Sequence, residues 1–96
     1  MLHNYMLLFD FMEILGKKWV VPLLLLLLLA EQTNFSHMKR QLRITSRALS
    51  KKLQLLEAVG LVQKIVLDNP KKIYYTLSIK GKEVSQAVTQ LSTYLA

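Results

Sequence analysis

Six positively charged side chains and no negatively charged one lie within residues 32–56. Lysine and arginine cations bind phosphate oxygens and release the counterions that condense on a polyanion. Arginine can also present two parallel N–H donors to the edge of a guanine. An acid-free basic segment therefore favours a nucleic-acid partner over an ordinary solvated surface. The six residues are Lys39, Arg40, Arg43, Arg47, Lys51 and Lys52.

These cations and their polar neighbours divide into two expected roles. Arg47 can bind guanine, Gln54 can pair with adenine, and a serine can reach a base or a phosphate. Phosphate contacts give affinity and register but carry no sequence information. Lys52 points toward the flank of its helix and is left out of both groups. The candidates for base reading are Ser46, Arg47, Ser50, Lys51 and Gln54. The candidates for phosphate binding are Lys39, Arg40, Arg43, Lys71 and Lys72.

The composition agrees with a polyanionic partner and argues against other classes. The chain of 96 residues has a formal net charge of +7 and a pI near 9.9. It contains no cysteine and two histidines, so we expect no disulfide, no metal site, no cofactor and a cytoplasmic location. No grouping of nucleophile, base and acid and no glycine-rich phosphate loop stands out. An enzyme is therefore the least favoured class.

The longest apolar run is too short to cross a membrane as a helix. Residues 19–30 are twelve apolar residues, whereas a spanning helix needs roughly 20. All thirteen lysines and arginines lie within residues 17–82, and residues 84–96 carry no charge. We therefore expect no membrane partner, and we expect both ends of the chain to be buried.

The hydrophobic pattern predicts an ordered series of elements in a single domain, residues 1–96. Thr45 is expected to cap a helix that Gly60 ends, and the polar break near Thr33 permits a short extended piece. Leucines 49, 53 and 56 share one side of the capped helix, and the base-reading candidates lie opposite. The predicted elements are an N-terminal helix over 1–16, a core helix over 18–30, a helix-turn-helix over 35–59, a hairpin over 61–78 and a C-terminal helix over 79–95.

This order of elements is that of a winged helix-turn-helix domain, and short motifs add a family resemblance. The motifs are residues 16–19 (Gly-Lys-Lys-Trp), 35–38 (Phe-Ser-His-Met), 53–62 (Leu-Gln-Leu-Leu-Glu-Ala-Val-Gly-Leu-Val) and 75–81 (Tyr-Thr-Leu-Ser-Ile-Lys-Gly). In these stretches the chain resembles the HxlR-type transcription regulators, with the MarR and PadR groups as wider relatives. It departs from that pattern in a shorter connection after Leu42, in Leu55 at a usually polar position, and in the missing cysteine, which excludes thiol-based sensing.

The resemblance implies a homodimeric, prokaryotic, sequence-specific regulator that binds double-stranded DNA. The implied fold is α+β, with N-terminal and C-terminal dimerisation helices and a two-stranded β-hairpin wing. In such a domain the recognition helix, residues 45–59 here, enters the major groove, and the wing near residues 68–72 lies on the backbone.

Two other functions remain open from the sequence. A sequence-neutral architectural protein of chromatin would also carry a basic face, and a winged-helix module can serve protein contact instead of DNA. A small-molecule effector could bind near the first helices, although a filled dimer interface is favoured there. Trp19 is expected to be a packing residue.

Overall fold

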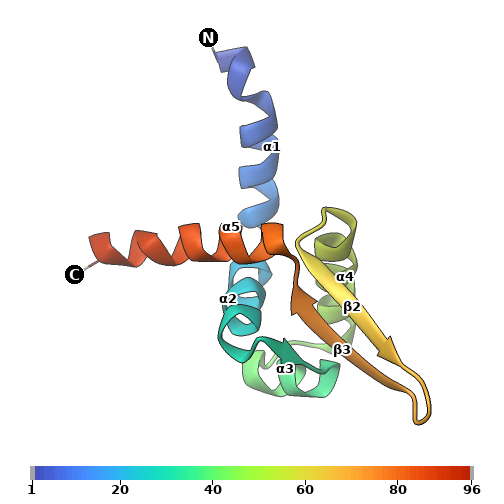
Figure 1. The fold of residues 1–96 in the computed structure, drawn as a ribbon. Helices are drawn as coiled ribbons and strands as arrows, with labels where there is room; N and C mark the ends of the chain where they lie inside the picture. Colours follow the sequence, from blue (N-terminus) through green and yellow to red (C-terminus); the bar gives the residue numbers. More distant parts are fainter. Residues whose placement is uncertain (1, 96) are drawn as a thin grey trace.

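The computed structural model describes residues 2–95 and shows a winged helix-turn-helix domain from which two helical arms project (Figure 1). The predicted order of elements and the α+β class are confirmed. The elements are η1 (Leu2–Tyr5), α1 (Met6–Leu15), α2 (Val20–Ala30), β1 (Gln32–Thr33), α3 (Phe35–Leu42), α4 (Ser46–Ala58), β2 (Val62–Leu67), β3 (Lys72–Leu77), α5 (Ile79–Gln90) and η2 (Leu91–Tyr94).

The sheet has one strand more than the predicted two-stranded wing. Strands β2 and β3 form the expected antiparallel hairpin, and β1 pairs with the other edge of β3 to give the order β1-β3-β2. In this pairing Gln32 lies opposite Thr76, and Thr33 opposite Tyr75. The hydroxyl of Thr76 also donates a hydrogen bond of 2.7 Å to the carbonyl oxygen of Glu31. The base of the wing is therefore tied to the end of α2.

Helix α2 is the centre of the hydrophobic core, as its run of leucines predicts. Leu23, Leu24 and Leu27 are fully buried, and Pro22 falls in the first turn, where a missing N–H disrupts no helical hydrogen bond. The buried residues that pack with them from the other elements are Met38, Ile44, Leu49, Leu53, Leu56, Leu61, Val62, Tyr75 and Leu77. One core thus holds α3, α4 and the base of the wing together.

Side-chain caps fix where α3 and α4 begin. The side chain of Asn34 accepts a hydrogen bond from the His37 N–H at 2.8 Å and starts α3. The hydroxyl of Thr45 accepts one from the Ala48 N–H at 3.2 Å and starts α4, as predicted. Each cap satisfies an N–H that the first turn of a helix leaves without a partner. The turn between α3 and α4 is therefore set by local sequence.

A tight junction joins the end of α4 to the wing and to α5. The hydroxyl of Ser78 donates to the carbonyl oxygen of Gly60 at 2.6 Å and accepts from the N–H of Gly81 at 2.9 Å. Gly60 has a φ of +78°, a left-handed conformation that favours glycine. A Cβ on Gly81 would collide with the backbone carbonyl of Leu61. The first turn of α5 therefore lies directly on the backbone where the recognition helix ends.

The prediction that both ends of the chain are buried is wrong for the single chain. No residue of α1 is buried, and the side chains of Leu7 and Tyr94 are each 85% exposed. Figure 1 shows α1 and the end of α5 leaving the body of the domain as separate arms. Helix α1 packs against the core only at its last turns, through Phe11 and Leu15. Apolar composition alone could not distinguish a core helix from an exposed apolar one.

Within residues 2–95, no helix has both the length and the apolar character that a membrane crossing needs.

Candidate nucleic-acid interface

Helix α4 presents its polar side to solvent and its leucines to the core. Leu49, Leu53 and Leu56 are at most 1% exposed, and the five base-reading candidates are all exposed. Four of those candidates, Ser50, Gln54, Arg47 and Lys51, span roughly 100° of the helix surface at 3.6 residues per turn. Ser46 adds a hydroxyl at the first position of the helix. These side chains therefore lie on one exposed face of α4, as their helical spacing predicts.

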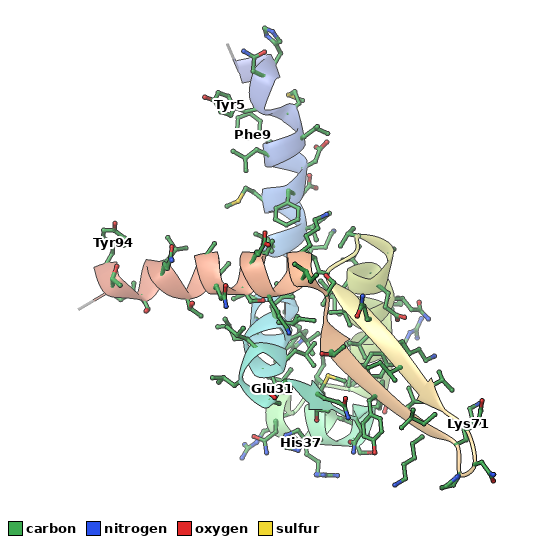
Figure 2. All side chains as sticks on the ribbon, in the orientation of Figure 1. Tyr5, Phe9, Glu31, His37, Lys71 and Tyr94 are labelled. Carbon is green, nitrogen blue, oxygen red and sulfur yellow. The ribbon has the colours of Figure 1, made fainter. Side chains whose placement is uncertain are left out.

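The phosphate candidates lie around that face on two separate elements. Lys39 and Arg40 are exposed in the last turn of α3, and Arg43 caps the helix with a left-handed φ of +53°. Lys71 lies in the turn of the hairpin, and Lys72 begins β3. Figure 2 shows Lys71 at the tip of the wing, far from the two helical arms. The cations are thus available on the helix-turn-helix and on the wing.

In the described part of the chain, none of the ten candidate side chains forms a hydrogen bond or an ion pair. Six acidic residues are present in the sequence, yet none neutralises this surface. Cations without a local carboxylate keep their attraction for an external polyanion. These side chains could therefore contact an external partner without first breaking a contact within residues 2–95.

Tyr75 supports the interface from within the core. Its side chain is 8% exposed, so it faces the core from β3. Burial raises the pKa of the Tyr75 phenol above its ordinary value, and the negative charge of Glu57 adds to the rise. The phenol stays neutral across the physiological range. Tyr75 therefore acts as a packing residue between the wing and the end of α4.

Lys80 connects three helices near the end of the recognition helix. Its ammonium donates a hydrogen bond of 3.2 Å to the carbonyl oxygen of Val59, the C-cap of α4. The same ammonium lies 5.8 Å from the centre of the Phe11 ring in α1. A cation at a helix C-terminus and over an aromatic face is favourable in both contacts. Lys80 could not be given this role from the sequence, because its partners lie in distant parts of the chain.

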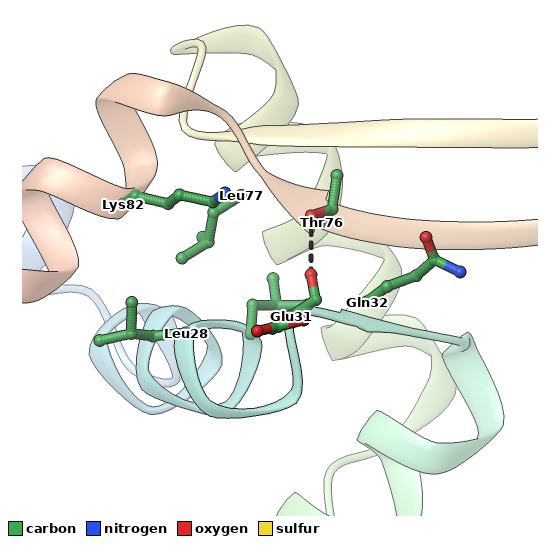
Figure 3. Close-up of a pocket in the computed structure, with 7 residues that line it drawn as sticks. Leu28, Glu31, Gln32, Thr76, Leu77 and Lys82 are labelled. Carbon is green, nitrogen blue, oxygen red and sulfur yellow. Dashed lines mark hydrogen bonds between the residues drawn. The ribbon is translucent and has the colours of Figure 1, made fainter.

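Several surface hollows lie on the described part of the chain. A polar one at the end of α2 has a volume of about 450 Å³. Its lining includes Glu31, Gln32, Thr76 and Lys82 (Figure 3). A second, of about 270 Å³, lies between the two arms and is almost wholly apolar. A third, of about 400 Å³, lies beside the turn that precedes α4 and contains Lys18, Trp19, Arg43 and Lys52. This hollow could not be predicted from the sequence.

The described residues hold no cluster of three His, Asp or Glu side chains that could bind a metal ion.

A buried helical core that carries an exposed basic helix, with a β-hairpin beside it, defines a winged helix-turn-helix protein. The chain belongs to the HxlR-like helix-turn-helix family, whose sequence model matches residues 14–96. It is 33% identical over 84 residues to the uncharacterized HTH-type transcriptional regulator YvaP of Bacillus subtilis (strain 168), a match that covers 85% of this chain and 77% of YvaP.

Solved structures agree with the family assignment. The reduced form of the transcriptional regulator YodB from B. subtilis is 25% identical, with a TM-score of 0.78, over 88% of this chain and 84% of YodB. The redox regulator HypR in its oxidized form is 27% identical, with a TM-score of 0.80, over 91% of both chains. The present sequence contains no cysteine.

Proposed function

We propose that the chain is a transcriptional regulator that binds double-stranded DNA in a sequence-specific manner as a homodimer. Helix α4 enters the major groove with Arg47, Ser50, Lys51 and Gln54 toward the bases, and Ser46 at its start. Lys39, Arg40, Arg43, Lys71 and Lys72 hold phosphates on either side. The observation that carries the proposal is the exposed face of α4, whose polar side chains form no hydrogen bond or ion pair with any residue of 2–95.

The exposed apolar arms support the homodimer. Between them lies the apolar hollow, to which α1 contributes Leu8, Phe11, Met12 and Leu15, α5 contributes Val84, Ala87 and Val88, and η2 contributes Leu91. Apolar surface of this extent on a small domain favours association. A two-fold axis through the arms would set two copies of α4 about 34 Å apart, one turn of DNA.

The first test distinguishes DNA binding from protein contact. Reversing the charge at Arg47 and Lys51, as a double substitution to glutamate, should abolish binding to duplex DNA because both side chains then repel phosphate. A matched double reversal at Lys64 and Lys82, on β2 and α5, should weaken binding far less. Full DNA binding by the first variant would favour a protein-interaction module.

The second test distinguishes a regulator from an architectural protein. A sequence-specific protein binds its own site about 10³- to 10⁷-fold more tightly than other DNA. Footprinting on genomic fragments at fixed salt should therefore protect discrete sites. Uniform protection of every fragment would favour the architectural function. The proposal assigns no catalytic step to the chain and gives it a cytoplasmic location beside the genome.

A further inference from the structure

The hollow beside the turn between α3 and α4 combines a cationic rim with an apolar floor. Its volume is about 400 Å³, within the range of small-molecule sites. Lys18, Arg43 and Lys52 contribute three positive charges, and no acidic side chain lines it. The residues that complete the lining are Trp19, Ile44, Thr45 and Ala48. We infer that this hollow binds a small organic anion with a flat apolar body, such as an aromatic carboxylate.

The three cations come from two distant parts of the sequence. Lys18 precedes α2, whereas Arg43 and Lys52 belong to the helix-turn-helix. The ammonium of Lys18 lies 5.5 Å from the centre of the Trp19 ring, so a charge is held beside the aromatic surface. Neither Lys18 nor Lys52 forms an ion pair within the described chain. A carboxylate at the rim would therefore meet cations that no internal acid neutralises.

The apolar floor of the hollow fits a ligand that has an apolar part as well as a negative charge. Ile44 is buried, and Trp19 and Ala48 are half-buried, so the indole and two aliphatic groups form an apolar surface beneath the charges. A flat ring laid on this surface would remove it from water, at a gain proportional to the apolar area covered. A DNA phosphate has no apolar part to place there. The lining therefore favours an amphipathic anion over the DNA backbone.

The backbone conformation at two residues of the hollow is also uncommon. Within residues 2–95 the non-glycine residues with a left-handed φ are Trp19, Glu31, Arg43 and Asn69. Two of these four line the hollow. Such conformations cost free energy and gather at ligand sites and switches. Trp19 and Arg43 are held in position by the start of α2 and by the end of α3.

Occupation of the hollow would affect DNA binding through Arg43, a consequence that rests on the proposed function. Arg43 is a phosphate candidate, and Thr45 caps the recognition helix. An anion that binds the Arg43 guanidinium takes one cation from the DNA backbone. The ligand would therefore act as an effector that weakens DNA binding.

The binding itself can be tested without DNA, because Trp19 is the only tryptophan in the sequence. Sodium benzoate, titrated at constant ionic strength, should change the Trp19 emission in a saturable manner. Benzamide, which has the same ring without the charge, should bind about tenfold more weakly, as should Lys52→Met against benzoate, since each lacks a charge-assisted contact. Lys64→Met, an exposed lysine on β2, is the control and should bind benzoate like the wild type. Lys18→Met provides a second rim variant.

Three results would overturn the inference: no saturable change with benzoate, equal affinity for benzamide, or an equal loss in Lys52→Met and Lys64→Met. Inorganic phosphate that matches benzoate in affinity would also overturn it, because the hollow would then be a plain phosphate site. A separate titration of a DNA complex with benzoate tests the effector role. If benzoate binds and DNA does not bind at all, the proposed function fails while the anion site stands.

Discussion

The junction between the wing and α5 yields a sharp prediction for Gly81→Ala. Gly81 is buried in the first turn of α5, and its missing side chain is what lets that turn lie on the backbone of Leu61. The added methyl group would collide with a carbonyl oxygen, which cannot rotate away as a side chain can. The helix must therefore move off the end of the recognition helix, or the junction must open.

The magnitude follows from two opposed effects. Overpacking costs up to about 3 kcal/mol, and the higher helix propensity of alanine returns at most about 1 kcal/mol. The net loss of unfolding free energy is then about 2 kcal/mol, which for a domain of this size lowers the Tm by roughly 8 to 16 °C. Thermal unfolding followed by circular dichroism, at one fixed protein concentration, measures the loss.

Gly16→Ala is the matched control for that measurement. Gly16 follows α1 with a φ of −78°, which alanine adopts without strain, and a Cβ there meets the Met12 carbonyl oxygen at 3.3 Å. A small shift relieves that contact, so we expect a change of no more than about 0.5 kcal/mol. An unchanged Tm in Gly81→Ala, or equal losses in the two variants, would refute the role assigned to the junction.

Four further substitutions test other parts of the account. Arg47→Ala should lose about 1 to 3 kcal/mol of binding free energy at the preferred site and relax specificity at one base, measured by competition among single-base variants of that site. Lys71→Ala should instead weaken binding to all sequences alike and lower the salt slope by roughly one unit, so equal uniform effects of both variants would contradict the division into readers and phosphate contacts. Thr45→Ala should cost about 1 kcal/mol of unfolding free energy through the lost cap, seen in urea denaturation. Met12→Lys, which places a charge in the apolar hollow, should shift sedimentation toward the monomer, and a wild-type chain that is already monomeric at micromolar concentration would contradict the dimer.

Local patterns predicted the elements of this fold well because their signals lie close together in the sequence. The cap at Thr45 and the leucines of α4 lie within a few residues of the contacts they make. Strand β1 depends instead on pairing between Gln32 and Thr76, far apart in the chain, so two residues of sequence could only permit it.

The exposed arms and the hollow at Trp19 show which parts of a functional surface could not be predicted from the sequence. The exposed face of α4 could be predicted, because helical spacing alone orients its side chains. Helical spacing could not predict that Lys18 lies near Lys52, since only the folded chain brings the residues before α2 to the same hollow as α4. Apolar composition also could not distinguish a helix that packs into the core from one that stays exposed in the single chain, as α1 does.

Selection of bound sequences from a pool of random duplexes tests the central claim most directly. The account predicts enrichment of a two-fold symmetric site whose half-sites lie about one helical turn apart, and loss of one base preference in each half-site when the pool is selected with Arg47→Ala. A pool that stays random after repeated selection at physiological salt would contradict sequence-specific recognition by α4.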